Sequence, residues 1–298
     1  MADLELVQLH GSSHVVPGPT NIGVIIHGSD AFLVDSGNDK EAGRKILRLC
    51  ESKGLSIKAI INTHSNADHI GANAYLQAKT GCRIFATKGE QAFIESPRLE
   101  PGFLWGGFAG TELDNKFFVA SPSKVTDSLG DPQVPEPEGI EIIGLPGHFV
   151  DMVGVLTEDR VFYIADCMFG PRVMEKHRIP FVYDVAAYKA TIERVRNTNA
   201  ACFVMSHGEV ETDIGKTAAD NLELIARLEG SILDAMAGES SFEKILAKVA
   251  TSFGIDLGYG QYALVGSTVR SFLSYLANEK KAIYRFKDNG MLWSRCER

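Results

Sequence analysis

The sequence is poor in cysteine, has no long apolar run and carries no excess of positive charge. Its five cysteines stand singly along 298 residues without a C-x-x-C pair, which argues against a disulfide framework and a thiolate zinc knuckle. No run reaches the roughly 18 apolar residues of a membrane span, and the N-terminus MADLELVQLHG lacks the apolar centre of a signal peptide. Acidic residues outnumber basic ones by 38 to 30, which argues against a nucleic-acid partner. We therefore expect a cytoplasmic protein that acts on a small molecule and has no membrane contact.

The composition that remains is that of a folded protein with a layered α/β core. Hydrophobic residues make up 45% and charged residues 23%, and the length corresponds to about two domains of roughly 150 residues. Up to about residue 210, short apolar runs typical of buried strands alternate with helical patterns, so we expect a sheet covered by helices. The predicted helices begin after a capping Asn38 or cover Asp68–Lys79 and Asp184–Arg196. The predicted strands are Gly23–Ile26, Ala31–Val34, Ala59–Asn62, Arg83–Ala86, Ile140–Gly144, Val153–Leu156, Val161–Ala165 and Cys202–Ser206.

Residues 95–138 and the C-terminal part depart from this alternation. The first segment gathers six prolines and the aromatic run LEPGFLWGGFAG, which is typical either of a lid with Trp105 on its apolar face or of an insertion packed on the surface. After about residue 214, three helical patterns and a hairpin signal at Asn289-Gly290 indicate a winged-helix-like appendage. We predict one domain over residues 1–213 and a helical C-terminal domain over residues 214–298, whose apolar helices would also suit a homodimer.

The stretch INTHSNADHIGA carries the strongest chemical signal. A strand ends near Thr63, a helix begins a few residues later, and between them stand His64, Asn66, Asp68 and His69. Alternate side chains of an extended turn share a face, so His64 and Asn66 can lie together, while Asp68 and His69 fall on the first helical turn. Neutral histidine nitrogens and carboxylate oxygens bind borderline divalent metals. The stretch therefore predicts a metal site. A helix-capping aspartate with histidines that bind no metal would give the same sequence pattern.

Three further candidate ligands each follow a predicted strand. His148 stands in LPGHFVDMVG, Asp166 ends VFYIAD, and His207 stands in CFVMSHGE. Each of them alone could be a buried core histidine or a turn aspartate. Three such residues in order after HSNADH are hard to obtain by chance, which favours a shared metal centre.

At these residues the chain resembles the metallo-β-lactamase fold superfamily of metal-dependent hydrolases. The pattern of that family starts with a strand-end aspartate, here Asp35 in FLVDSG, and continues with H-x-H-x-D-H, a histidine, an aspartate and a final histidine. The resemblance spans roughly residues 20–210. It implies an α/β fold of the αβ/βα four-layer sandwich type, with two facing sheets, helices outside and metals at one sheet edge.

The resemblance also implies a role for each residue of the pattern. Asp35 ties the turn that holds the ligands, and Asp166 bridges two metals. The chain departs from the family at Asn66, which stands where the second histidine is usual, and a neutral amide is a poorer zinc ligand than imidazole. Asn66 is therefore expected to be at most a weak ligand. The implied ligands are His64, residue 66 and His148 for the first metal, and Asp68, His69 and His207 for the second.

The implied activity is hydrolysis of a small ester, thioester, lactone or amide by a metal-activated water. A metal lowers the pKa of bound water toward about 7 and polarises the substrate oxygen, and Asp68 orients the water. The cofactor is then zinc, as one or two ions, with iron or manganese as alternatives. His64, His148 and Asp166 alone also match a two-histidine, one-carboxylate triad, as in the iron-dependent sulfur dioxygenases of this fold. A degenerate site, a nucleic-acid-directed protein and a non-catalytic member stay open.

Candidate substrate contacts lie between Asp166 and the helix predicted from Asp184. Arg172, His177 and Tyr183 are polar residues in the segment that follows a ligand-bearing strand, where loops line the site. His177 is interpreted as a general acid or an anion contact, although an ordinary surface histidine explains it equally well. With Trp105 of the candidate lid, these residues are the expected substrate-binding set.

Overall fold

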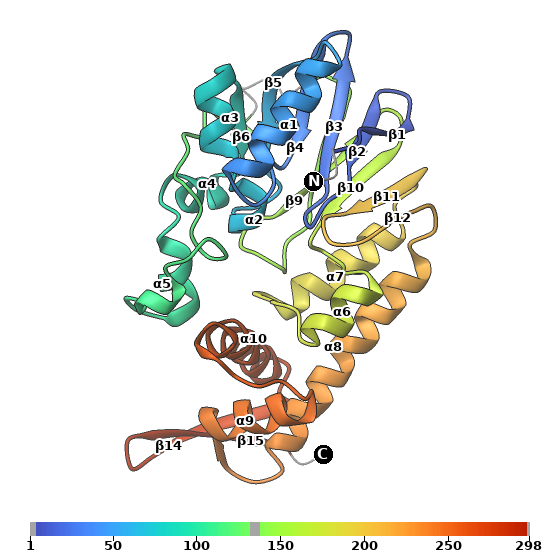
Figure 1. Cartoon of the computed structure of the whole chain (residues 1–298). Coiled ribbons are helices and arrows are strands. Elements are labelled where there is room, and N and C mark those ends of the chain that lie inside the picture. Colours follow the sequence, from blue (N-terminus) through green and yellow to red (C-terminus); the bar gives the residue numbers. More distant parts are fainter. Residues whose placement is uncertain (1–3, 132–137, 297–298) are drawn as a thin grey trace.

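Two β-sheets face each other, with helices on their outer faces (Figure 1). The computed structural model describes residues 4–131 and 138–296. The second sheet has five strands, in the order β12 (Val210–Glu211), β11 (Cys202–Met205), β10 (Val161–Ala165), β9 (Val153–Thr157) and β8 (Ile140–Gly144). The first sheet has seven strands in sequence order, namely β1 (Val7–His10), β2 (Ser13–Val16), β3 (Ile22–His27), β4 (Asp30–Val34), β5 (Ser56–Ile61), β6 (Arg83–Ala86) and β7 (Asp127–Ser128).

The faces of the two sheets that meet are apolar. Ile25 and Phe85 of the first sheet share one buried cluster with Val155 and Val204 of the second. On the outer faces, α1 (Lys40–Ser52) and α3 (Asn73–Thr80) pack on the first sheet, and α7 (Val185–Arg196) packs on the second. These layers bury both faces of each sheet, so the predicted αβ/βα four-layer sandwich is confirmed.

All eight predicted strands are present, with small differences at their ends. The strands that the sequence did not predict are β1, β2, β7, β12 and β13 (Ser240–Ser241). Each of these has only two to four residues, which is too short for an alternating pattern to stand out from a loop.

The predicted cap of the first helix needs correction, whereas that of α7 does not. The Asp39 carboxylate accepts a hydrogen bond from the Ala42 amide at 3.0 Å, so Asp39 and not Asn38 caps α1. Both residues are good caps, and the sequence cannot tell which of two neighbours takes that position. The helix predicted over Asp184–Arg196 is α7, with Asp184 as its cap.

The single helix predicted over Asp68–Lys79 is two helices, α2 (Ala67–Ile70) and α3. Ser36 interrupts the hydrogen-bond ladder between them. Its amide donates to the His69 carbonyl at 2.8 Å, and its hydroxyl accepts from the Ala72 amide at 3.2 Å. A residue 33 positions away in sequence from His69 therefore ends α2, which no local pattern could indicate.

The proline-rich segment is folded over its described part. It follows α4 (Lys88–Glu95) and contains α5 (Leu99–Trp105), the short 3-10 helix η1 (Thr111–Leu113) and β7. Leu104 and Phe118 of this segment are buried with Ala263 of the C-terminal region in a separate small cluster. Three of the prolines counted above, at positions 132, 135 and 137, lie outside the described residues. The segment thus forms a wall that packs against the C-terminal helices.

The C-terminal region contains the predicted three helices and hairpin. They are α8 (Gly215–Ala235), α9 (Phe242–Ser252), α10 (Tyr259–Asn278), β14 (Ala282–Lys287) and β15 (Gly290–Arg295), with β13 completing a small sheet. Lys287 pairs with Gly290, so the turn residues are Asp288 and Asn289, one position before the predicted Asn289-Gly290, and both have the positive φ of a type I′ turn. Among the described residues, no helix combines the length and apolarity needed to cross a bilayer. The winged-helix likeness, the boundary at residue 213 and the homodimer stay predictions.

Candidate metal centre

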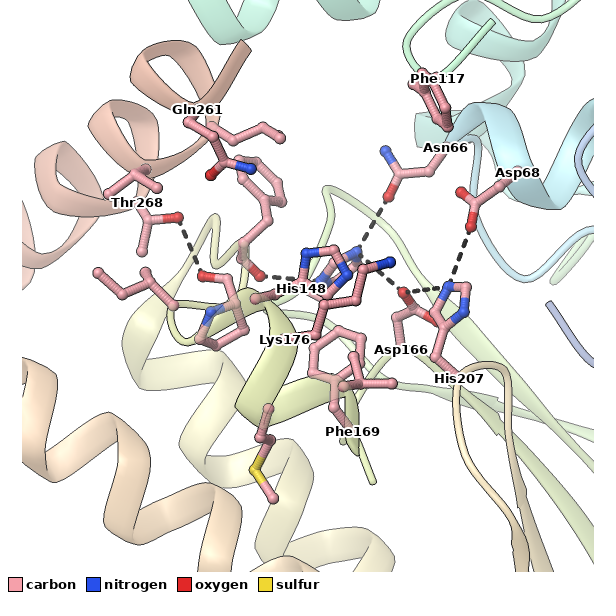
Figure 2. Close-up of a pocket in the computed structure, with 18 of the residues that line it drawn as sticks. Asn66, Asp68, Phe117, His148, Asp166, Phe169, Lys176, His207, Gln261 and Thr268 are labelled. Carbon is pink, nitrogen blue, oxygen red and sulfur yellow. Dashed lines mark hydrogen bonds and ion pairs between the residues drawn. The ribbon is translucent and has the colours of Figure 1, made fainter. Parts of the chain in front are cut away.

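The six predicted ligands meet at one edge of the sandwich, where strands of both sheets end. Figure 2 shows four of them, Asp68, His148, Asp166 and His207, around the pocket. The stretch HSNADH follows β5 and runs into α2, while His148, Asp166 and His207 follow β8, β10 and β11. Two groups form, each with its donor atoms within 4.8 Å of one another. The first group is His64, His148 and Asp166, and the second is Asp68, His69 and His207.

Two of the histidines are oriented by backbone carbonyls. Nδ1 of His148 lies 3.0 Å from the carbonyl oxygen of Phe181, and Nδ1 of His207 lies 2.8 Å from that of Pro19. A carbonyl oxygen only accepts hydrogen bonds, so Nδ1 carries the ring proton in each case. Nε2 of the neutral ring then keeps its lone pair, and this atom faces the centre.

Asp35 orients the other two histidines, as the resemblance implied. Its carboxylate accepts hydrogen bonds from Nδ1 of His69 at 2.8 Å and from the amide and hydroxyl of Thr63 at 2.8 and 2.7 Å. The Thr63 hydroxyl in turn lies 3.0 Å from Nδ1 of His64. Asp35 is buried and has a φ of 62°, a backbone conformation that aspartate tolerates better than most residues. One carboxylate therefore directs Nε2 of both His64 and His69 into the centre.

Three buried polar atoms at the centre have no hydrogen-bond partner. They are Nε2 of His64, Nε2 of His69 and Oδ1 of Asp166. Buried polar groups in proteins are nearly always satisfied, and leaving one unpaired costs free energy. When both rings are neutral, the lone pairs of two imidazoles and a carboxylate directed at a common space are satisfied by a cation. The donor set fits zinc, iron and manganese alike.

Opposite charges set the protonation of the second group in the absence of metal. Burial opposes a charge on His207, but the Asp166 and Asp68 carboxylates raise its pKa to about 9. Against the same burial, Asp68 and Asp166 also raise the pKa of His69 well above its ordinary value. In the first group, burial lowers the pKa of His64 and of His148. Metal binding to the second group must therefore displace protons, so it should strengthen as the pH rises.

This protonation predicts how the stability of the chelator-treated chain depends on pH. The pKa of His207 is about 9 in the folded chain and near its ordinary 6.5 in the unfolded chain. Its contribution to stability is therefore fully present below pH 6.5 and is lost as the pH rises through 9. In urea unfolding at pH 6 and pH 9, the stability difference between the natural chain and His207→Gln should shrink at the higher pH. A difference that stays constant would contradict the ion pairs assigned to His207.

Asn66 lies beside the first group and is tied to the proline-rich segment. Its Oδ1 lies 3.1 Å from Nε2 of His148 (Figure 2), and its Nδ2 donates to Oε1 of Glu100 at 2.8 Å. Glu100 belongs to α5 and is only 5% exposed. Burial raises the pKa of Glu100 well above its ordinary value, and the hydrogen bond from Asn66 acts against that rise. The residue that departs from the family pattern is thus held by a second buried polar side chain.

A pocket of about 560 Å³ opens from the two groups toward the C-terminal helices. Its size is typical of a small-molecule site. Part of its lining comes from α6 (Pro171–His177) and α10. Apolar side chains make up much of the wall, including Phe118, Phe169, Phe181, Leu224, Leu264 and Val265.

Two of the four predicted substrate contacts line this pocket. Arg172 and His177 do so from α6. Tyr183 and Trp105 are not among the lining residues: the ring of Tyr183 lies 5.4 Å from that of Phe103, and Trp105 stacks on Tyr259 at 4.7 Å. Trp105 thus joins the proline-rich segment to α10.

Several residues that line the pocket were not predicted from the sequence. Lys176 lies on α6 four positions after Arg172, a spacing that would have indicated it once this helix was recognised. Glu100, Lys116 and Gln261 come from distant segments, and no local pattern pointed to them.

Comparisons with known proteins agree with this centre. The Metallo-beta-lactamase superfamily matches residues 15–207. A hydroxyacylglutathione hydrolase of Bradyrhizobium sp. strain BTAi1 is 28% identical over 151 residues, which cover 50% of this chain and 49% of that protein. An atrochrysone carboxyl ACP thioesterase of Pseudocercospora fijiensis strain CIRAD86 is 23% identical over 222 residues, which cover 73% of this chain and 56% of that protein. The chain spans about half the length of the curated relatives it matches.

The fold likeness to a solved structure extends over the C-terminal region as well. The crystal structure of a metallo-beta-lactamase family protein from Thermus thermophilus has a TM-score of 0.73 at 18% identity. The match covers 99% of each chain. At 18% identity, this likeness shows only that the helices and strands are arranged in a similar way.

Proposed function

The chain belongs to the metallo-beta-lactamase superfamily, and on this basis we propose that it is a metal-dependent hydrolase of a small ester, thioester, lactone or amide, with thioesters favoured. The observation that carries the proposal is the convergence of six donor side chains, four of which line the pocket and three of which have buried atoms that lack a hydrogen-bond partner. Thioesters are favoured because relatives are named as a hydroxyacylglutathione hydrolase and an ACP thioesterase. A bound divalent metal supplies a water of lowered pKa and polarises the substrate oxygen.

Asp68 is the side chain best placed to orient the attacking water. Its Oδ2 accepts a hydrogen bond from the Thr20 hydroxyl at 3.1 Å and lies 3.1 Å from Nε2 of His207. Its side chain is 36% exposed and lines the pocket. Although burial opposes its charge, His69 and His207 hold the pKa of Asp68 well below its ordinary value. An ionised carboxylate held in this way can accept a hydrogen bond from the water and so orient it.

Attack by a cysteine of the chain has no support at this centre. Cys167 follows Asp166 directly, but its side chain is fully buried. Burial, together with the Asp166 charge, raises the pKa of its thiol well above the ordinary value. A buried thiol that stays protonated is a poor nucleophile, which leaves water as the attacking group.

The pocket suits a substrate with an apolar part and an anionic part. Arg172 and Lys176 stand one helical turn apart on α6 and line the pocket, and neither has an ion-pair partner among the described residues. Burial and the neighbouring Lys176 lower the pKa of His177, so it acts as a neutral hydrogen-bonding side chain rather than a cation. We therefore assign the anionic part of the substrate to Arg172 and Lys176, and its apolar part to the apolar side chains of the lining.

Paired thioesters test this assignment and the proposed activity together. With metal supplied, the natural chain should hydrolyse hexanoyl-CoA, which is anionic, and the neutral hexanoyl thioester of N-acetylcysteamine, and a chelator should abolish both activities. In the double variant Arg172→Gln and Lys176→Gln, kcat/KM for hexanoyl-CoA should fall about 100-fold or more, because each hydrogen bond to a charged group contributes about 1.5–3 kcal/mol and two are lost. The neutral thioester should be hydrolysed as before.

The control for charge alone is Lys216→Gln, which removes an exposed cation of α8 that pairs with Asp220. It should change neither rate. Equal losses for both thioesters in the double variant would contradict the anion assignment. No hydrolysis of either thioester by the metal-loaded natural chain would remove the support for thioesters as the favoured class.

An iron-dependent oxygenase is a second candidate, because His64, His148 and Asp166 form a separate group of two histidines and one carboxylate. Such triads suit iron(II) and oxygen chemistry. This candidate predicts one iron per chain and oxygen consumption. The hydrolase predicts that hydrolysis proceeds equally well without oxygen.

A further inference from the structure

The first group of ligands has an unusual neighbour in the amide of Asn66. Its two ends face different partners, with Nδ2 at 2.8 Å from Oε1 of Glu100 and Oδ1 at 3.1 Å from Nε2 of His148. An amide presents a donor at one end and an acceptor at the other. The side chain next to the amide therefore decides whether the amide oxygen or the amide nitrogen faces the metal centre.

The Glu100 oxygen selects the orientation in which the Asn66 oxygen faces the centre. In the structure the amide nitrogen lies on the side of Glu100 and donates to its Oε1, which leaves the amide oxygen facing the centre. Among the described residues, the side-chain amide of Asn66 has two polar contacts. They are the hydrogen bond to Glu100 and the contact with His148. Without Glu100 the amide would be free to turn and to donate its NH₂ group to the lone pair of His148.

The contact between Asn66 and His148 brings two lone pairs together. Nδ1 of His148 carries the ring proton because it faces the Phe181 carbonyl, so Nε2 of the neutral ring is an acceptor. Oδ1 of Asn66 is an acceptor as well, and the two atoms lie 3.1 Å apart. Two acceptors without a hydrogen between them are satisfied by a cation that both coordinate. Nε2 of His64 and Oδ1 of Asp166 lack partners in the same region.

We propose that Glu100 is a positioning residue that fixes Asn66 as an oxygen ligand of the first group. This inference rests on the proposed metal-dependent function and deepens it. With Asn66 included, the first group offers two imidazole nitrogens from His64 and His148 and two oxygens from Asn66 and Asp166. Oxygen ligands suit manganese better than a third imidazole does. The first group therefore takes an oxygen-preferring divalent cation such as Mn²⁺.

The location of Glu100 explains how the proline-rich segment takes part in the centre. Glu100 stands in the first turn of α5, and the same helix places the ring of Phe103 5.7 Å from that of Phe149. The Phe149 ring lies 6.3 Å from the ring of His64. The segment thus contacts the first group through a hydrogen bond and through a chain of aromatic rings.

Mn²⁺ binding to the full-length chain tests the proposal directly. The chain is stripped with a chelator and carries His207→Ala, which removes the second group, so that calorimetric titration with MnCl₂ reports the first. Glu100→Leu should raise the dissociation constant for Mn²⁺ about 10- to 100-fold, the usual cost of losing a residue that orients a metal ligand. Glu100→Gln keeps an oxygen that accepts from Asn66 and should stay within about threefold of the parent.

A double-mutant cycle separates positioning from a general structural effect. Asn66→Ala should weaken Mn²⁺ binding as Glu100→Leu does, and the double variant should be no weaker than Asn66→Ala alone. Circular dichroism and the melting temperature confirm folding, and Glu100→Met replaces Glu100→Leu if that variant does not fold. Equal losses for Glu100→Leu and Glu100→Gln, or additive losses in the cycle, would overturn the role of Glu100. If the natural chain bound neither Mn²⁺ nor Zn²⁺, the proposed metal-dependent function would be contradicted as well as the role of Glu100.

Discussion

Replacing Asp166 by alanine should abolish metal retention and reduce hydrolysis by about 10³-fold or more, because metal-ion catalysis supplies several kcal/mol of transition-state stabilisation. Asp166 belongs to the first group of ligands and also lies close to two histidines of the second. Its carboxylate lies 3.4 Å from Nε2 of His69, 3.5 Å from that of His207 and 3.8 Å from that of His148. Without it, the four histidines of the two groups keep Asp68 as the one carboxylate among the six candidate ligands. Metal content by mass spectrometry and kcat/KM on one thioester measure the loss.

The matched control for Asp166→Ala is Asp234→Ala. Asp234 is an exposed acid of α8 and makes no contact with the centre. The control should keep the metal content and the activity of the natural chain. If Asp166→Ala retained its metals and most of its activity, the role assigned to this carboxylate would be wrong.

The second large effect is expected for Asp35→Asn, which should lower the free energy of unfolding by about 3–5 kcal/mol in the chelator-treated chain, the usual cost of breaking a buried charge pair. Asparagine fits the positive φ of Asp35, so the backbone is not strained by the change. Its NH₂ group, however, can take the place of an oxygen that accepts from Thr63 and His69. When His69 is neutral, as metal binding requires, an NH₂ group facing its Nδ1 favours the tautomer with the proton on Nε2, the atom that faces the centre. Metal affinity should fall about 10- to 100-fold as well.

Asp159→Asn is the control that separates metal binding from stability. Asp159 also accepts three side-chain and backbone hydrogen bonds, from Ser12 and Ser13, but it lies at the far end of β9 from the metal centre. This variant should lose stability in urea unfolding without a change in metal affinity. A loss of affinity as large as that of Asp35→Asn would contradict the orienting role of Asp35.

The fold and the six ligands could be predicted because their signals are local. Val161–Ala165 is an apolar run that has to be buried, and Asp166 follows it directly. His64 to His69 lie within one short turn between a strand and a helix, which places them together whatever the rest of the chain does. The order of these signals along the chain was enough to indicate the family.

The features that escaped prediction depend on contacts between distant segments. Glu100 is 34 positions from Asn66, and nothing in the run LEPGFLW shows that its glutamate faces a metal centre. The hydrogen bonds that end α2 come from Ser36, which is distant in sequence. The pattern after Asp68 therefore predicts one continuous helix. Trp105 has the apolar surface expected of a substrate contact, but its ring stacks on that of Tyr259 on α10. Tertiary packing decides each of these cases.

The most direct test of the account is the number of divalent metal ions in the chain purified without chelator or added metal. Mass spectrometry should find about two ions per chain, one for each group of ligands, and about none in Asp166→Ala. A natural chain that holds no divalent metal as purified, and takes up none when Zn²⁺ or Mn²⁺ is supplied in excess, would contradict the metal centre and the proposed hydrolase with it.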